Sequence, residues 1–203
     1  MHSSLADLAD GNAISVRQKK EWGEILTGWE TKNRYEVSTA GHESLFFAGE
    51  VGTSFLSRHF LGGRRPFTIE VKDNSGATAL VVRRPWRWFF PYAEVFDGDG
   101  RKLGAVQRRW AWLSRRYDLQ DDNGHTVAQL HGPVFRPWTF RIMVDGRESG
   151  RITKKWSGLL KESFTKADNF GVQFDGELDL WFRAVCLGAT FLIDFVHFER
   201  KKR

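Results

Sequence analysis

Cysteine is almost absent from this 203-residue chain, and no common catalytic motif is present. The single cysteine, Cys186, rules out an intrachain disulfide and a metal site built from cysteines. The six histidines, at positions 2, 42, 59, 125, 131 and 197, have none of the spacings of zinc ligands. There is no glycine-rich phosphate loop ending in Lys-Ser/Thr and no nucleophile elbow. We therefore expect that the chain has no chemical active site and is not an enzyme that catalyses a chemical step.

The N-terminal residues also lack a cationic segment followed by an apolar one, so we expect no secretory signal. This indicates a cytoplasmic protein, or one attached to a membrane from its cytoplasmic side. The formal net charge of +6 and the isoelectric point near 9.6 favour anionic partners. Nucleic acid and an acidic lipid surface both meet that description.

Long apolar runs are rare, and residues 181–199 form the only one. On a helix the polar residues near and within this run fall on one narrow stripe; they are Asp179, Arg183, Thr190, Asp194 and His197. A helix this apolar must be enclosed by protein or by lipid. Its uninterrupted apolar part, residues 184–193, is short for a membrane span, which favours a buried core helix over the alternative of a single-pass span. In a core, Asp194 would need a cation or a donor from the surrounding wall.

Before this helix, turn sequences recur at a constant step of 24 residues. Asp73, Asp97, Asp121 and Asp145 each begin a turn that contains glycine, and Asp, Asn and Gly suit the positive-φ positions of tight hairpins. Two strands fit between successive turns, so the pattern predicts an up-and-down meander that closes into a barrel. A helix inside it requires more than eight strands. The predicted fold is therefore mainly β, with about twelve antiparallel strands around the helix at 181–199. We expect a flexible arm over residues 1–17 and one barrel domain over residues 18–203.

The bends between the Asp-Gly turns are rich in arginine, lysine and tryptophan, and alternate connections of a meander lie at opposite ends of a barrel. One end should therefore carry a basic, aromatic rim that holds six of the nine tryptophans. Its candidate lipid-binding residues are Arg83, Arg84, Trp86, Arg87, Trp88, Arg108, Arg109, Trp110, Trp112, Arg136, Trp138, Lys154, Lys155 and Trp156. Three interpretations stay open. The tryptophans could pack the barrel end, they could insert into an anionic membrane, or they could stack on the bases of a nucleic acid.

Long motifs in the chain resemble those of the phospholipid scramblases over about residues 18–199. They include the stretches at 25–37, 65–76, 156–165 and 167–174, and the apolar helix with its 188–195 segment. The resemblance implies a tubby-like fold, a twelve-stranded barrel around a hydrophobic helix. It also implies energy-independent movement of phospholipids between leaflets, stimulated by calcium, at the cytoplasmic side of the plasma membrane. The implied partner is an anionic phospholipid membrane, and homo-oligomers are an open alternative.

Two other functions stay in view beside lipid movement. One is a peripheral adaptor that binds anionic lipids, such as phosphoinositides, without transporting them. The other is a regulator that binds nucleic acid, which the basic charge keeps open although the family resemblance disfavours it.

The chain departs from the family pattern in two places. The family's palmitoylated cysteine-rich segment corresponds to residues 86–91, which contain no cysteine, so aromatic side chains would have to replace acyl chains as an anchor. The segment that the resemblance implies for calcium has Lys166 where the family usually has an acidic residue, and that charge would weaken binding. The candidate ligands are Asp168, Asn169, Gln173, Asp175, Glu177 and Asp179. The alternative is a strand and turn leading into the helix, with Asp179 paired to Arg183.

Overall fold

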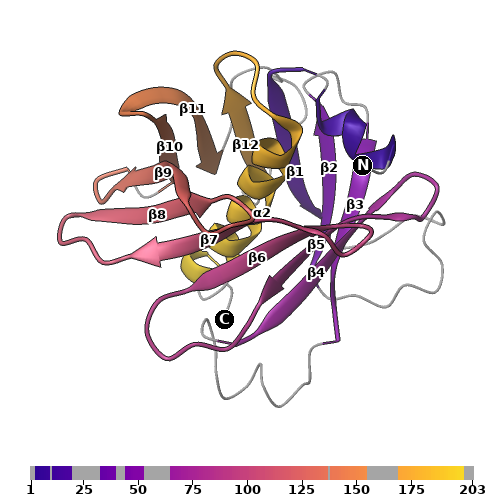
Figure 1. Cartoon of the computed structure of the whole chain (residues 1–203), viewed down its shortest axis with the longest axis horizontal. Helices are drawn as coiled ribbons and strands as arrows, with labels where there is room; N and C mark the ends of the chain where they lie inside the picture. Colours follow the sequence, from indigo (N-terminus) through magenta and orange to yellow (C-terminus); the bar gives the residue numbers. More distant parts are fainter. Residues whose placement is uncertain are drawn as a thin grey trace.

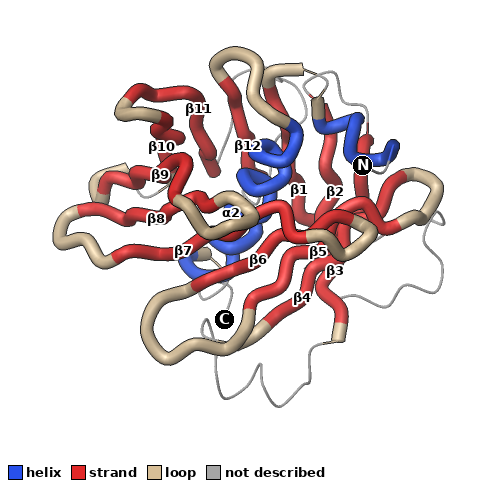
Figure 2. The backbone as a smooth tube through the Cα atoms, in the orientation of Figure 1, coloured by secondary structure: helices blue, strands red, loops and turns tan. Residues whose placement is uncertain are grey.

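Twelve antiparallel strands form a closed barrel around one α-helix in the computed structural model of the chain (Figures 1 and 2). The structure describes residues 3–9, 11–19, 33–39, 44–52, 65–136, 138–154 and 169–198. The strands are β1 (Ala13–Lys19), β2 (Arg34–Thr39), β3 (Ser44–Val51), β4 (Phe67–Asp73), β5 (Thr78–Arg84), β6 (Tyr92–Asp97), β7 (Lys102–Arg109), β8 (Ser114–Gln120), β9 (Thr126–Pro133), β10 (Thr139–Val144), β11 (Arg147–Lys154) and β12 (Asn169–Phe174). A short 3-10 helix η1 (Ser3–Leu8) precedes them, and α2 (Leu180–His197) follows. The fold class expected from the sequence is confirmed.

The hairpin turns lie where the 24-residue spacing predicts them. Gly76, Gly100, Gly124 and Gly146 all have positive φ, between 77° and 89°. In the first turn, the Asp73 carboxylate accepts hydrogen bonds from the backbone N–H groups of residues 75 and 77. The aspartates at 97 and 121 accept backbone N–H groups in the same way. Each turn thus fixes its own geometry locally, which is why spacing alone revealed it.

The N-terminal residues belong to the barrel, and this corrects the expected arm over residues 1–17. Strand β1 pairs with β12 on one side and with β2 on the other, so it closes the barrel. Ahead of it, Leu5 and Leu8 of η1 are buried. The Arg183 guanidinium of α2 donates to the carbonyl oxygens of Leu8 and Gly11 and ties this segment to the start of the core helix. The barrel domain therefore includes described residues that were expected to belong to the flexible arm.

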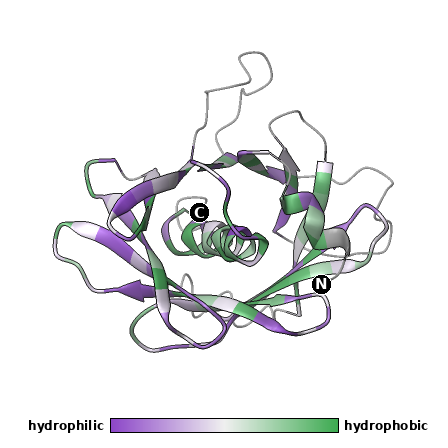
Figure 3. Cartoon of the chain, turned by 45° about the horizontal axis from the view of Figure 1, so that its top comes forward, coloured by the Kyte–Doolittle hydropathy of each residue, from purple (hydrophilic) through white to green (hydrophobic). Residues whose placement is uncertain are grey.

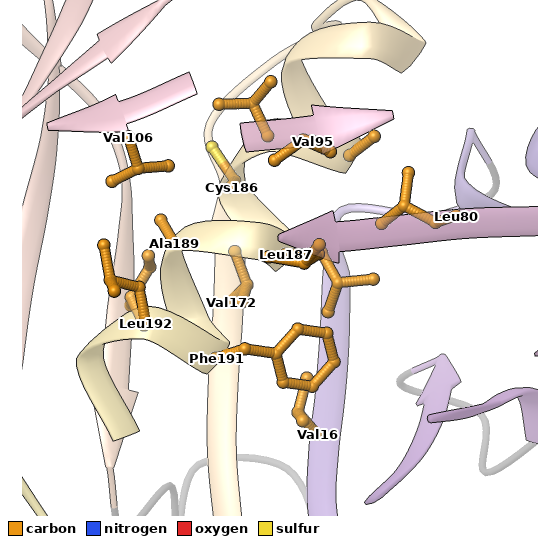
Figure 4. Packing of buried hydrophobic residues seen from close by; sticks show 14 of the residues in the cluster. Val16, Leu80, Val95, Val106, Val172, Cys186, Leu187, Ala189, Phe191 and Leu192 are labelled. Carbon is orange, nitrogen blue, oxygen red and sulfur yellow. The ribbon is translucent and has the colours of Figure 1, made fainter. Parts of the chain in front are cut away.

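Helix α2 runs through the interior, and Figure 3 shows it ringed by strands. Every residue from Phe182 to Phe195 is buried. The helix approaches β6 and β7 closely because glycines stand at the contacts: a Cβ on Gly188 would lie 2.6 Å from Val95, and one on Gly104 would lie 2.8 Å from Val185. Figure 4 shows the side chains of this core packed around Cys186, Ala189 and Phe191. The barrel wall encloses the helix, as the core interpretation expected.

By length and composition, α2 is also long and apolar enough to cross a membrane. It is the one such helix in the part of the chain that the structure describes, with a mean hydropathy of 1.4. However, 78% of that 18-residue window is buried inside the barrel. Burial of this kind is typical of the core helix of a folded domain, where strands take the place of lipid.

Candidate functional site

The large hydrophobic side chains that are exposed gather at one end of the barrel. Among the described residues, all of them lie in the connections β5–β6, β7–β8 and β9–β10. They are Trp86, Trp88, Phe89, Phe90, Trp110, Trp112, Leu113, Val134, Phe135 and Trp138. We call this set the aromatic rim. In Figure 1 the connection β5–β6 lies at the lower left and the connection β7–β8 at the left edge, both away from the Asp-Gly turn that joins β4 to β5. An exposed apolar patch of this kind typically marks an interaction site.

Four of the five tryptophans of the rim pack in pairs within their own loops. The rings of Trp86 and Trp88 are 4.7 Å apart between centroids, and those of Trp110 and Trp112 are 5.9 Å apart, both edge to face. Even so, 81% of Trp112 is exposed. The rings therefore stiffen the loops while most of their surface stays open to the surroundings.

The basic residues predicted for this end divide into two groups, because successive residues of a strand point to opposite faces. Arg83, Arg87, Arg109 and Arg136 are exposed. Arg87 lies over the ring of Tyr92 at 4.1 Å, a cation–π contact that holds it beside the rim.

The second group of basic residues faces the interior. Arg84 is buried, with its guanidinium 5.8 Å from the Phe67 ring centroid, and Arg108 is half-buried. Neither lies on the open surface where the rim was predicted. Lys155 and Trp156 lie outside the described residues.

Lys154 is also buried, where it neutralises the charge of the core helix. Its ammonium nitrogen lies 3.3 Å from one carboxylate oxygen of Asp194, and the hydroxyl of Tyr35 donates to the other at 2.8 Å. The rings of Phe170 and Phe198 flank the ammonium group at 5.0 and 4.1 Å. The wall thus supplies both the cation and the donor that an aspartate in this apolar helix was expected to need, and Lys154 has a structural role instead of a surface one.

The end of α2 carries a second polar contact. The Tyr117 hydroxyl and His197 Nε2 lie 2.7 Å apart, with the imidazole between the rings of Tyr117 and Phe140. Burial, reinforced by the charges of Arg115 and Arg108, lowers the pKa of His197 to about 3. The imidazole is therefore neutral at physiological pH, and burial raises the pKa of the Tyr117 phenol, which stays protonated.

Because the pKa of His197 is lowered in the folded chain, we expect the free energy of unfolding to decrease in acid. In the unfolded chain His197 has an ordinary pKa near 6.5. Between about pH 6.5 and pH 3 the unfolded chain therefore binds a proton that the native chain does not, and stability falls as the pH falls. At up to about 1.4 kcal/mol per pH unit, His197 would account for a loss of roughly 2 kcal/mol between pH 7 and pH 5. Urea unfolding at both pH values should show a larger loss in the wild type than in His197→Gln, and equal losses would contradict this role.

The described candidate calcium ligands lie on β12 and in the connection between β12 and α2. Asn169 and Gln173 lie on β12, four residues and so roughly 13 Å apart at strand geometry. Asp175, Glu177 and Asp179 follow the strand and are exposed, and Asp168 lies outside the described residues. Nowhere in the described ranges do three or more His, Cys, Asp or Glu side chains form a group suited to a metal ion. Calcium binding by the candidate residues stays a prediction, and it would need six to eight oxygens around one point.

The expected pair between Asp179 and Arg183 takes a different form. The backbone N–H of Arg183 donates to the Asp179 carbonyl oxygen, as in any first helical turn. The Arg183 side chain instead donates to backbone carbonyls, including that of Leu178 at 3.2 Å. The Asp179 carboxylate accepts from the Trp181 indole at 3.3 Å.

Among the apolar members of the aromatic rim, the sequence analysis listed only tryptophans as candidate lipid-binding residues, although it considered the aromatic side chains of residues 86–91 as an anchor. Phe89, Phe135 and Leu113 are 88%, 90% and 72% exposed, more than most of the tryptophans. The available signal was their position inside the same bends, since an apolar residue in a tight connection between two strands has no sheet face to cover it.

Comparison with known proteins identifies relatives that are similar over nearly the whole chain. A family model described as Scramblase matches residues 1–200. The chain is 37% identical over 210 residues to phospholipid scramblase 1 of Mus musculus, and the aligned region covers 97% of this chain and 64% of that protein. It is 32% identical over 209 residues to the Homo sapiens phospholipid scramblase 1, with coverage of 96% and 65%. It is 30% identical over 209 residues to the human phospholipid scramblase family member 5, with coverage of 96% and 77%.

The chain thus spans just under two thirds of the length of phospholipid scramblase 1. No solved structure matches it significantly. The match to the family model covers nearly the whole barrel and its core helix. On this extent of similarity, the chain belongs to the scramblase family.

Proposed function

We propose that this protein docks on anionic membranes through its aromatic rim and promotes the energy-independent, bidirectional movement of phospholipids between leaflets. The observation that carries the docking step is the gathering of the exposed large hydrophobic side chains of the described residues into three neighbouring loops. Aromatic side chains are favoured at the level of lipid headgroups. Membership of the scramblase family supports the transport step. The activity moves lipids and makes or breaks no covalent bond.

The cytoplasmic side of the plasma membrane is the location we propose. Its leaflet carries anionic lipids, and a chain with a formal net charge of +6 is attracted to it. Exposed arginines, including Arg83, Arg87 and Arg136, lie in or beside the loops that would insert. Tryptophan and phenylalanine at residues 86–90 would provide the anchor, since that stretch has no cysteine to acylate.

How such a protein would move lipids is constrained by the position of α2. A headgroup needs a polar path across about 30 Å of hydrocarbon. The helix that could span is instead enclosed, and its Asp194 is paired with Lys154 inside the barrel. We infer that the protein acts from the surface, by locally thinning the bilayer or by assembling several copies. Stimulation by calcium stays a prediction.

The enclosed helix also favours a second candidate function. Among the described residues, the one helix that could span a membrane is enclosed in the barrel. Such a barrel could bind anionic lipid as a peripheral adaptor without transporting it. The two functions share the docking step and differ only in lipid movement, so one experiment separates them.

The test uses the purified chain with vesicles that contain anionic lipid and a fluorescent lipid in both leaflets. Replacing Trp88, Trp110 and Trp112 together by alanine should weaken vesicle binding more than 100-fold, because a buried side chain of this size contributes roughly 2 kcal/mol. The matched variant with phenylalanine at the same positions should retain most binding. Lipid movement is measured by bleaching the outer-leaflet fluorophore, with and without calcium.

Each result has a defined meaning. Vesicle binding that is unchanged by the alanine substitutions would contradict docking through the aromatic rim. Docking without loss of inner-leaflet fluorescence would contradict transport and leave the adaptor function.

A further inference from the structure

Four arginines and a histidine form a continuous row across the outer wall of five neighbouring strands. The strand register pairs Arg109 with Arg116, Arg116 with His131, His131 with Arg141, and Arg141 with Arg151. We call these five residues the arginine row. It runs across β7, β8, β9, β10 and β11, which lie side by side at the left in Figure 1.

The row faces outward from the barrel. Its neighbours along the strands, Tyr117, Leu130 and Phe140, are completely buried and point at the core. Because side chains alternate between faces, the residues beside them point away from the core. Arg116 and Arg141 are exposed accordingly.

This arrangement opposes folding. Adjacent strands lie about 4.8 Å apart, and like charges directly opposite each other on a sheet destabilise it. The ends of the row are neutralised: Arg109 pairs with Asp118, and Arg151 with Glu148 at 3.0 Å.

In the described part of the chain, the arginines in the middle of the row are not neutralised in this way. Within the ranges that the structure describes, Arg116 and Arg141 pair with no carboxylate. They flank His131, whose Nε2 lies 3.2 Å from Gln129 Oε1. Burial and then the charges of these two arginines lower the pKa of His131, which favours the neutral form of the imidazole. The centre of the wall thus presents two exposed guanidinium groups that no carboxylate in the described ranges neutralises.

The row also lies directly beside the aromatic rim. Arg109 immediately precedes Trp110, and Arg141 follows Trp138 by three residues. His131 precedes Val134 by the same interval, so the row lies within roughly 10 Å of the loops along the strands. If the rim inserts among the acyl chains at the bilayer surface, the row reaches the depth of the headgroups.

We propose that the arginine row binds the phosphate groups of anionic phospholipids, so that the barrel docks with the rim end of its β7–β11 wall against the bilayer. Guanidinium groups bind phosphate oxygens in a bidentate manner, and the two guanidinium groups on either side of His131, which pair with no carboxylate in the described ranges, can each bind a phosphate in this way. The proposal rests on membrane docking through the aromatic rim, and adds which wall contacts the lipid and which chemical group it binds.

The test compares two double variants of the whole chain with the same net charge. Arg116→Gln/Arg141→Gln removes the middle of the row. Arg101→Gln/Arg147→Gln removes two exposed arginines beside the Asp-Gly turns at the opposite end of the barrel. Binding to phosphatidylcholine vesicles with phosphatidylserine should fall about 30-fold for the first variant, at about 1 kcal/mol per basic residue near the surface. The second should bind nearly as the wild type does.

Thermal unfolding tests whether a loss of binding comes only from a loss of folding. The row variant should melt at the wild-type temperature or slightly above it, since the change relieves repulsion between like charges. A row variant that binds vesicles as tightly as the turn variant would overturn the proposal. If in that case the variant with alanine in place of the three tryptophans still binds vesicles more weakly than the wild type, docking through the aromatic rim would remain supported. A row variant that loses binding to duplex DNA while vesicle binding is unchanged would also overturn the proposal, in favour of a nucleic-acid surface.

Discussion

Replacing Lys154 by methionine is expected to lower the free energy of unfolding by about 3–5 kcal/mol, the usual cost of removing one partner from a buried ion pair. Methionine keeps the length of the side chain but leaves the Asp194 carboxylate inside the barrel with the Tyr35 hydroxyl as its remaining described donor. The contacts of the ammonium group with the Phe170 and Phe198 rings are lost as well. Urea unfolding followed by circular dichroism measures the effect.

The matched control removes both charges. Lys154→Met combined with Asp194→Leu should recover most of the lost stability, because an apolar pair of similar volume often replaces a buried ion pair without net cost. A single variant that unfolds at the wild-type urea concentration would show that the pair contributes little. A double variant no more stable than the single one would assign the loss to packing.

Cys186 provides the most sensitive measure of where α2 lies. In the detergent-free protein, a water-soluble thiol reagent should label Cys186 at least about 1000-fold more slowly than in denaturant. The thiol is completely buried, and reaction requires an opening that costs much of the free energy of unfolding, about 5–15 kcal/mol for a typical domain. Burial also raises the pKa of the thiol, which disfavours the reactive thiolate.

The contrary outcome is equally clear. A chain that dissolves only in detergent, with Cys186 protected only in lipid, would indicate that α2 spans the membrane. Protection in the soluble monomer, lost on denaturation, would support action from the membrane surface. Since Cys186 is the only cysteine in the chain, the native protein needs no substitution for this measurement.

The sequence by itself determined the plan of the barrel, because its signals are local. The four Asp-Gly turns are fixed by backbone conformations that few residues other than glycine adopt. Their constant spacing implied the meander, and the apolar run with one polar stripe implied an enclosed helix. The position of the aromatic loops at one end followed from the alternation of connections. These inferences did not depend on the register, that is, on which residues of neighbouring strands lie opposite each other.

Only the tertiary structure decided which charged side chains are exposed and which are buried. Arg83 and Arg84 are adjacent and chemically identical, yet one is exposed and the other buried, because a strand turns successive side chains to opposite faces. Lys154 looked like a surface cation until the wall placed it against Asp194, 40 residues away in the sequence. The arginine row consists of residues from five strands that align only through the register. Register is a long-range property, set by the packing of both faces at once, and no short stretch of sequence contains it.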